Sequence, residues 1–187
     1  RAINMKIGTT LIDFVGSTTI FTSQLEGALK DKGATGLVLL SVNTDAIKTN
    51  LRIPNFFHRI ITFVLLAKNY IVLLARAISC SRNQLFIFNI PLMPSIEILF
   101  VWLIGLKSGI SIGILHNEIP SHGETNHIRN YRYAEFYNCC DVIVFHDSSI
   151  LKTFDETFPN AIPVLLDLPS YKVPNANDYK NRQDLAP

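Results

Sequence analysis

Short apolar runs alternate with longer segments of helical periodicity along most of the chain. The apolar runs are bounded by glycine, proline or polar residues, a pattern typical of strands buried on both faces. These runs predict about six strands, at residues 5–14, 36–42, 84–90, 110–115, 141–145 and 162–166. The segments between them predict helices, at residues 17–32, 53–79 (one long helix or two), 95–107, 128–140 and 148–158.

Strands separated by helices predict a mainly parallel sheet with right-handed crossovers. The predicted fold class is therefore α/β: a doubly wound, Rossmann-like, three-layer domain with about six strands. Its predicted bounds are residues 1–170. Residues 171–187 are polar and contain proline, which predicts a linker or tail towards a C-terminal domain.

Two apolar segments could be either membrane spans or parts of the folded domain. Residues 85–106 are long enough to cross a bilayer, but Pro91 and Glu97 interrupt them, so a buried strand followed by a buried helix is predicted. Residues 53–79 leave two interpretations open, because the chain has no acidic residue between Asp45 and Glu97. One is a core helix, which the sequence favours slightly; the other is a helix lying on an anionic membrane surface.

The amino-acid composition and net charge limit the classes of function and the cellular compartment that fit this chain. Of the 187 residues, 48 % are apolar, and the formal net charge is only +2. The basic residues form no continuous stripe, so we expect no nucleic-acid partner. The three cysteines form neither a CxxC motif nor an even framework, which fits a reducing, cytoplasmic compartment. Adjacent Cys139 and Cys140 are interpreted as buried apolar residues. If residues 53–79 lie on a membrane surface, the protein would be peripherally attached to the membrane.

Polar side chains directly follow two of the predicted strands. His116 ends the strand 110–115 and begins a polar loop, and His146 follows the strand 141–145. In an open parallel sheet, ligands bind outside the carboxyl ends of the strands, so both histidines are candidates for a site. A hydrogen-bonded strand end is the alternative for His116. In the loop after it, three residues are candidates for binding the hydroxyl groups of an acceptor: Asn117, Glu118 and His122. The alternative is that this loop is simply solvated.

Further candidates lie near helix starts. Gly16 and Ser17 belong to the first strand–helix turn, where backbone N–H groups can meet a phosphate, although an ordinary turn explains a single glycine equally well. Arg129 and Arg132 are candidates for a phosphate of the acceptor or donor, with a surface ion pair to Glu135 as the alternative. The dense histidines and glutamates of the polar loop match no helical metal-ligand spacing, so no metal is predicted.

Residues 85–171 resemble the second half of the N-terminal domain of a GT-B glycosyltransferase of the large retaining family four. The resemblance rests on the order of moderately specific motifs rather than on any one of them. These are FIFNIPLMPSIEILFVWLIGLK, ISIGILHNEIP, IRNYRYAEFYNCCD, DVIVFHDSSILKTFDETFP and AIPVLLDLP. The first half of the chain matches only in outline, as a strand, a glycine turn and a helix.

The resemblance implies the acceptor-side domain of an enzyme that moves a sugar from a nucleotide sugar to a saccharide or lipid-linked acceptor. It implies that His116, which matches the family's strand-end histidine, contacts the transferred sugar and is the catalytic candidate. The nucleotide sugar is a substrate in this scheme, and no separate cofactor is implied.

One departure from the family concerns the donor. The family's C-terminal domain holds most of the nucleotide sugar and carries two glutamates eight positions apart, a pair that does not occur in this sequence. We therefore expect this chain to be inactive alone, its partner being a C-terminal domain or a separate catalytic subunit. Two other functions stay open: a non-catalytic, membrane-docking subunit of a split glycosyltransferase, and a generic nucleotide-binding domain.

Overall fold

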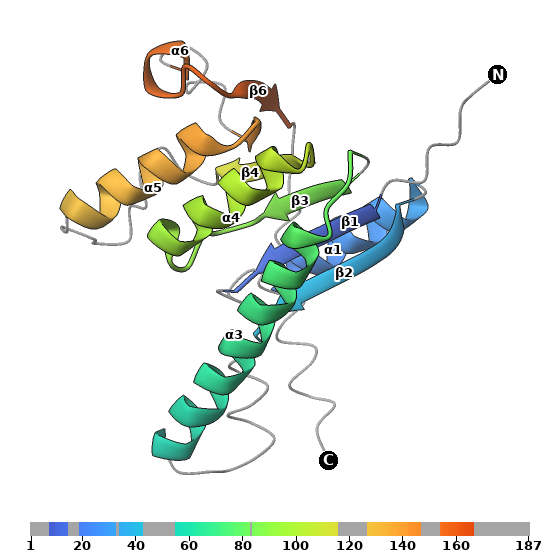
Figure 1. Ribbon diagram of the computed structural model, residues 1–187, viewed down its shortest axis with the longest axis vertical. Helices are drawn as coiled ribbons and strands as arrows, with labels where there is room; N and C mark the ends of the chain where they lie inside the picture. The colour runs from blue at the N-terminus through green and yellow to red at the C-terminus, as the bar shows by residue number, and fades with distance from the viewer. Residues whose placement is uncertain are drawn as a thin grey trace, which may run out of the picture.

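A computed structural model of the chain describes residues 8–14, 19–32, 34–42, 55–82, 84–115, 127–146 and 154–166. These residues form a six-stranded sheet flanked by helices (Figure 1). The strands are β1 (Gly8–Asp13), β2 (Thr35–Ser41), β3 (Gln84–Phe88), β4 (Ile110–Leu115), β5 (Val142–Phe145) and β6 (Ile162–Leu165). Their spatial order is β2-β1-β3-β4-β5-β6, and every neighbouring pair is parallel. The predicted Rossmann-like α/β fold is thereby confirmed.

The helices occupy the predicted positions between the strands. They are α1 (Thr19–Asp31), α3 (Asn55–Ile78), α4 (Pro94–Leu106), α5 (His127–Cys139) and α6 (Phe154–Thr157). The apolar segment after β2 is one long helix rather than two. Residues 147–153, where the last helix was predicted to begin, lie outside the described residues, as do residues 167–187.

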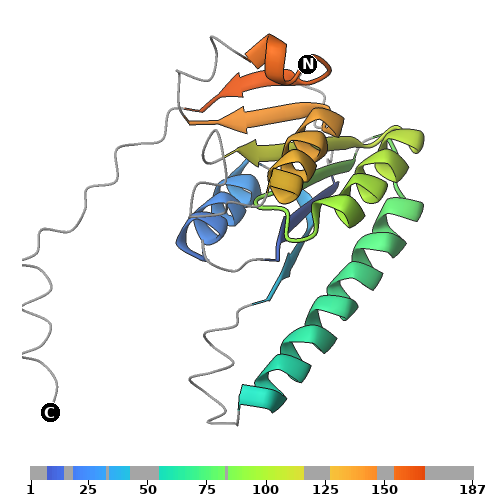
Figure 2. The same cartoon turned by 90° about the vertical axis from the view of Figure 1, so that its left-hand side faces the viewer.

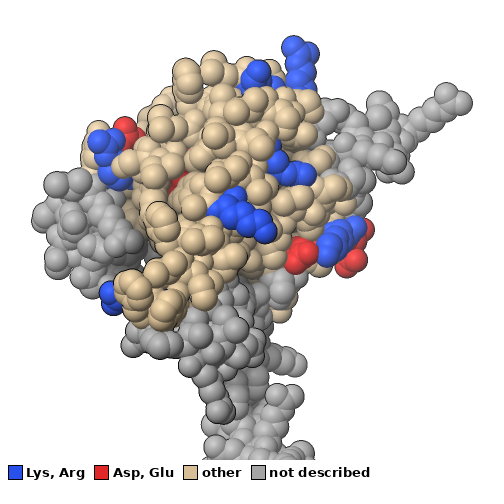
Figure 3. Space-filling model, turned by 60° about the horizontal axis from the view of Figure 1, so that its bottom comes forward, with Lys and Arg blue, Asp and Glu red and all other residues tan. Residues whose placement is uncertain are grey.

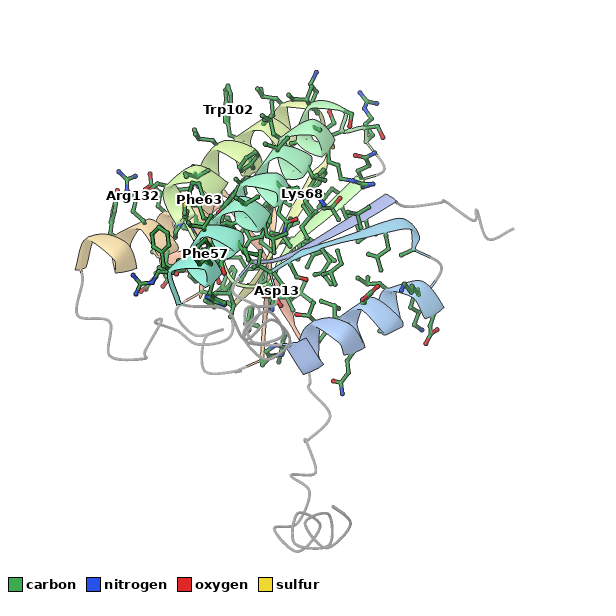
Figure 4. The ribbon with its side chains drawn as sticks, turned by 90° about the horizontal axis from the view of Figure 1, so that it is seen from below. Asp13, Phe57, Phe63, Lys68, Trp102 and Arg132 are labelled. Atoms are coloured by element: carbon green, nitrogen blue, oxygen red, sulfur yellow. The ribbon has the colours of Figure 1, made fainter. Side chains whose placement is uncertain are left out.

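The sheet separates two apolar clusters, because successive side chains of a strand point to opposite faces. On one face, Leu25 and Leu29 of α1 pack against Leu11, Ile87 and Ile114. The opposite face carries the larger cluster, to which α3, α4, α5 and α6 contribute. Figure 4 shows the strands between α1 on one side and α3 and α4 on the other. The described part of the chain therefore has the predicted three layers.

Helix α5 approaches the sheet closely at Gly113. A Cβ at this position would lie 2.9 Å from Cδ1 of Tyr137 and 3.2 Å from Sγ of Cys140. The Tyr137 hydroxyl donates a hydrogen bond of 3.0 Å to the carbonyl of Ile114. The glycine thus leaves room for the Tyr137 ring beside β4, where its hydroxyl bonds to the backbone.

Only one of the two adjacent cysteines is buried, so the prediction was right for Cys140 and wrong for Cys139. Cys140 is 1 % exposed, whereas Cys139 is exposed to solvent. Consecutive residues at the end of a helix point in directions about 100° apart, so only one of the pair can face the sheet.

Strand β6 forms one edge of the sheet. The backbone N–H groups of Ile162 and Leu166 donate to the carbonyls of Asp141 and Phe145, each at 2.9 Å. Pro163 lies between them and pairs in register with Ile143. The side chains of β6 are exposed throughout its length.

Candidate functional site

The order of the strands creates a switch point between β1 and β3. From β1 the chain first adds β2 on one side, and then crosses to β3 on the other side. In open α/β sheets, ligands bind in the crevice outside the carboxyl ends of the strands at such a point. The candidate site is therefore the carboxyl edge of the sheet at β1 and β3.

Three polar side chains meet at this point. Asp13 is the last residue of β1, Asn89 directly follows β3, and Thr22 belongs to the start of α1. The Thr22 hydroxyl donates to Oδ2 of Asp13 at 2.5 Å, and Nδ2 of Asn89 donates to the Thr22 hydroxyl at 3.4 Å. All three residues are buried. The backbone N–H of Asn89 also donates to the carbonyl of Ile12 at 2.9 Å, which fixes Asn89 against the end of β1.

The trio brings a carboxylate, a hydroxyl and an amide together at the switch point. The buried carboxylate of Asp13 lies near the first turns of α1, whose N–H groups favour negative charge. A carboxylate only accepts hydrogen bonds, whereas an amide both donates and accepts. Because these three residues are buried and bonded to one another, they hold the ends of β1 and β3 against α1 at the switch point.

Most of the residues predicted for the site lie outside the described residues. These are Gly16, Ser17, His116, Asn117, Glu118 and His122. The described elements beside them are at the predicted edge, because β1 ends at Asp13 and β4 ends at Leu115. The proximity of His116 to the Gly16 turn stays a prediction.

The two arginines belong to α5. Nothing is described of the Arg129 side chain. Arg132 forms an ion pair with Glu135, with Nη1 at 2.5 Å from Oε2, and its guanidinium lies 5.9 Å from the centre of the Tyr131 ring. Both partners of the ion pair are partly exposed, and Figure 4 shows Arg132 well separated from Asp13. The observed contact is the surface pair that the sequence left as the alternative.

His146 contacts the backbone of the neighbouring strand. Its Nδ1 lies 3.2 Å from the carbonyl oxygen of Leu166, so the ring ties the carboxyl end of β5 to that of β6. Two strands, β3 and β4, separate β5 from β1 in the sheet. His146 is thus at the predicted edge, but not at the switch point.

Sequence reasoning missed the trio of Asp13, Thr22 and Asn89. The signal available was a polar residue at the end of the first strand and another after the third. That signal gains meaning only when the strand order places β1 beside β3.

In the sequence, Glu97 stands out only as a charge that interrupts a possible membrane span, but the structure buries it completely. The Tyr70 hydroxyl and the backbone N–H of Leu92 donate to its Oε1, at 2.9 and 3.2 Å. Oε2 has no hydrogen-bond partner among the described residues. Burial raises the pKa of Glu97 to about 7, and burial together with the nearby Glu97 raises the pKa of Tyr70. The Tyr70–Glu97 contact joins α3 to α4.

Among the described residues, no three His, Cys, Asp or Glu side chains lie together in a group that could hold a metal ion. The histidines and glutamates of the loop after β4 lie outside the described residues.

No protein-family model matches the chain, and a comparison with curated proteins gives no match. The chain is therefore classified by its fold, which is an α/β domain with a six-stranded, all-parallel, Rossmann-like sheet.

Proposed function

We propose that this chain is the acceptor-side domain of a glycosyltransferase, which moves a sugar from a nucleotide sugar to a saccharide or lipid-linked acceptor. The observation that carries the proposal is the buried trio of Asp13, Thr22 and Asn89 at the switch point of the sheet. Hydrogen-bonding groups at this point suit a ligand rich in hydroxyl groups, such as a sugar.

The resemblance of residues 85–171 supports the sugar class. Its motifs correspond in order to β3, α4, β4, α5, β5 and β6. In this scheme, His116 donates a hydrogen bond to a hydroxyl of the transferred sugar or to the charge that develops during transfer. The diphosphate leaving group is stabilised mainly by a donor-side domain. Positioning of the acceptor is then the principal contribution of this chain.

A non-catalytic, membrane-docking subunit of a split glycosyltransferase is the second candidate. The observation that favours it is the exposed apolar surface of α3 and α4, which contains Phe63 and Trp102. The two candidates differ in the carboxyl edge, which binds saccharide in the first and only positions a partner in the second.

Saturation-transfer NMR with the methyl glycosides of common hexoses tests the proposal. We expect saturable binding of at least one glycoside to the chain, and loss of that binding in Asp13→Asn. Asp141→Asn is the matched control, because Asp141 lies before β5 at the opposite edge, where its Oδ2 accepts hydrogen bonds from Ser111. Absence of glycoside binding, or equal binding by wild type and Asp13→Asn, would reject an acceptor site at the switch point.

A further inference from the structure

Helices α3 and α4 lie side by side and expose one continuous apolar surface, named here the α3–α4 face. On α3 its exposed residues recur at helical spacing, namely Phe56, Ile60, Phe63, Ile71, Leu74 and Ile78, with the half-buried Ala67 between Phe63 and Ile71. On α4 they are Met93, Ile96, Leu99, Trp102 and Leu106. Phe56, Phe63, Ile71, Leu99 and Trp102 are each between 64 and 68 % exposed. The prediction of a buried helix after β3 is therefore correct for only one side of α4.

A different side of α3 forms the core, so packing within the domain does not account for the α3–α4 face. Leu73 and Ala77 are fully buried against the sheet. Nδ2 of Asn69 donates to the carbonyl of Ser41 at 2.9 Å, and Nη1 of Arg76 lies 3.2 Å from the Thr10 hydroxyl. These contacts, with that between Tyr70 and Glu97, hold the C-terminal part of α3 to the domain.

The N-terminal part of α3 projects beyond the sheet. Asn69 contacts Ser41, the last residue of β2, and the helix runs back from there towards the start of β3. Residues 55–68 precede this contact and form about 20 Å of helix at a rise of roughly 1.5 Å per residue. Figure 2 shows this end of α3 reaching away from the strands. It reaches past the edge that carries the candidate site.

The exposed charges on α3, α4 and the turns after them are basic. Between Asp45 and Glu118 the only acidic residue of the sequence is Glu97, which is fully buried. Exposed basic residues accompany both helices, namely Arg59, Lys68, Arg82 and Lys107. Figure 3 shows a broad uncharged surface on which Lys and Arg atoms are scattered, while most acidic atoms lie at its margins. Aliphatic and aromatic residues bordered by basic ones are typical of a helix in the headgroup region of an anionic membrane.

The alternative interpretation of α3 is a helix that crosses the membrane. Among the described helices, residues 56–78 alone are long and apolar enough to cross a bilayer, and 11 % of their most apolar window is buried. That test uses length and composition only. Crossing would pull Leu73 and Ala77 out of the core and break the hydrogen bond between Tyr70 and Glu97. The packing therefore favours a helix in the plane of the membrane surface.

We propose that the α3–α4 face docks in plane on an anionic lipid bilayer, which brings the carboxyl edge of the sheet close to the membrane surface. The basic border would repel a second copy of the same face, whereas it attracts anionic headgroups. Docking extends the proposed function, because it selects an acceptor that is itself carried by a lipid.

Trp102 is the only tryptophan of the chain, so its fluorescence reports directly on the face. We expect a blue-shifted emission, and quenching by brominated lipid, when phosphatidylglycerol is included in phosphatidylcholine vesicles. Both signals should weaken as salt is added, because salt screens the attraction to anionic lipid. Unchanged Trp102 emission with either vesicle would overturn the proposal.

Charge substitutions on exposed apolar residues provide the matched comparison. Ile71→Glu and Leu99→Glu should lose vesicle binding several-fold or completely, whereas Ile162→Glu, at a similarly exposed residue of β6, should retain it. Equal binding by all three variants would overturn the proposal. So would sedimentation that shows a wild-type dimer, monomeric Ile71→Glu and no vesicle binding, since the occupant would then be a second copy. Glycoside binding in solution needs no vesicle, so it separates failure of docking from failure of the proposed sugar site.

Discussion

At the scale of single residues, Glu97 is a carboxyl group buried where two helices meet. Its Oε1 accepts hydrogen bonds from α3 and from the chain before α4, but its burial still raises the pKa to about 7. The proton is therefore bound more tightly in the folded than in the unfolded chain. The stability that Glu97 contributes is fully present below its ordinary pKa of 4.5 and is lost as the pH rises through about 7.

Glu97→Gln should remove this pH dependence, because the amide keeps an acceptor for Tyr70 and carries no charge. A pKa change from 4.5 to about 7 corresponds to roughly 3 kcal/mol. Urea unfolding at about pH 5 and about pH 8 should show the wild type losing much of this amount relative to the variant. Glu135→Gln, at a partly exposed residue of α5, is the control and should leave the difference unchanged. Parallel stability curves for wild type and Glu97→Gln would contradict the role of this carboxyl group.

His116 gives the second prediction at this scale. His116→Ala should leave the melting temperature nearly unchanged, since no large apolar volume is removed, while activity falls in the enzyme that includes the donor-side domain. The loss should lie mainly in kcat if the imidazole acts on the transition state. A lower melting temperature with unchanged turnover per folded molecule would instead mean a structural histidine.

Individual site residues were harder to predict than their location. The carboxyl edge followed from the parallel arrangement of strands, and β4 was predicted with its observed bounds because polar residues follow its apolar run at once. Asp13 and Asn89 were missed because each is an ordinary strand-end residue in the sequence. Their relation depends on β1 lying beside β3, and chain order alone does not give that neighbour.

At the scale of elements, α3 shows which features of a helix the hydrophobic periodicity of the sequence can predict. The length and continuity of α3 could be predicted from the sequence, since no residue between Asn55 and Ile78 stops a helix. Which side of α3 packs on the core and which side is exposed could not be predicted. Periodicity separates a core side from a solvent side only when the solvent side is polar. In α3, Leu73 and Ile71 are chemically alike, but the first is buried and the second is 67 % exposed.

The contact of α5 with β4 gives a prediction about elements. Gly113→Ala should destabilise the domain by about 1–3 kcal/mol, since its methyl group would press on Tyr137 and Cys140. Gly105→Ala is the matched control: nothing lies within 4 Å of its added Cβ, and it should stabilise α4 by about 0.5–1 kcal/mol. Thermal unfolding followed by circular dichroism measures both. Equal effects of the two substitutions would show that α5 has room to shift.

At the scale of the whole molecule, the sheet offers one switch point among the described strands. In the proposed function, an acceptor binds there and the nucleotide sugar binds a partner domain. The chain alone should therefore bind nucleotide sugars weakly or not at all, and should catalyse no transfer. Isothermal titration calorimetry with several nucleotide sugars is the measurement. Tight, saturable binding of any of them would assign the donor to this domain instead.

The position of Pro163 bears on what happens when many copies of this domain meet. The N–H groups of Ile162 and Leu166 point inward to β5, and N–H directions alternate along a strand, so residue 163 faces outward. Proline has no N–H there, so it costs the sheet no hydrogen bond and withholds a donor from any incoming strand. An exposed apolar edge such as β6 is otherwise a template for edge-to-edge aggregation. We therefore expect Pro163 to act on the solubility of the domain rather than on its folding.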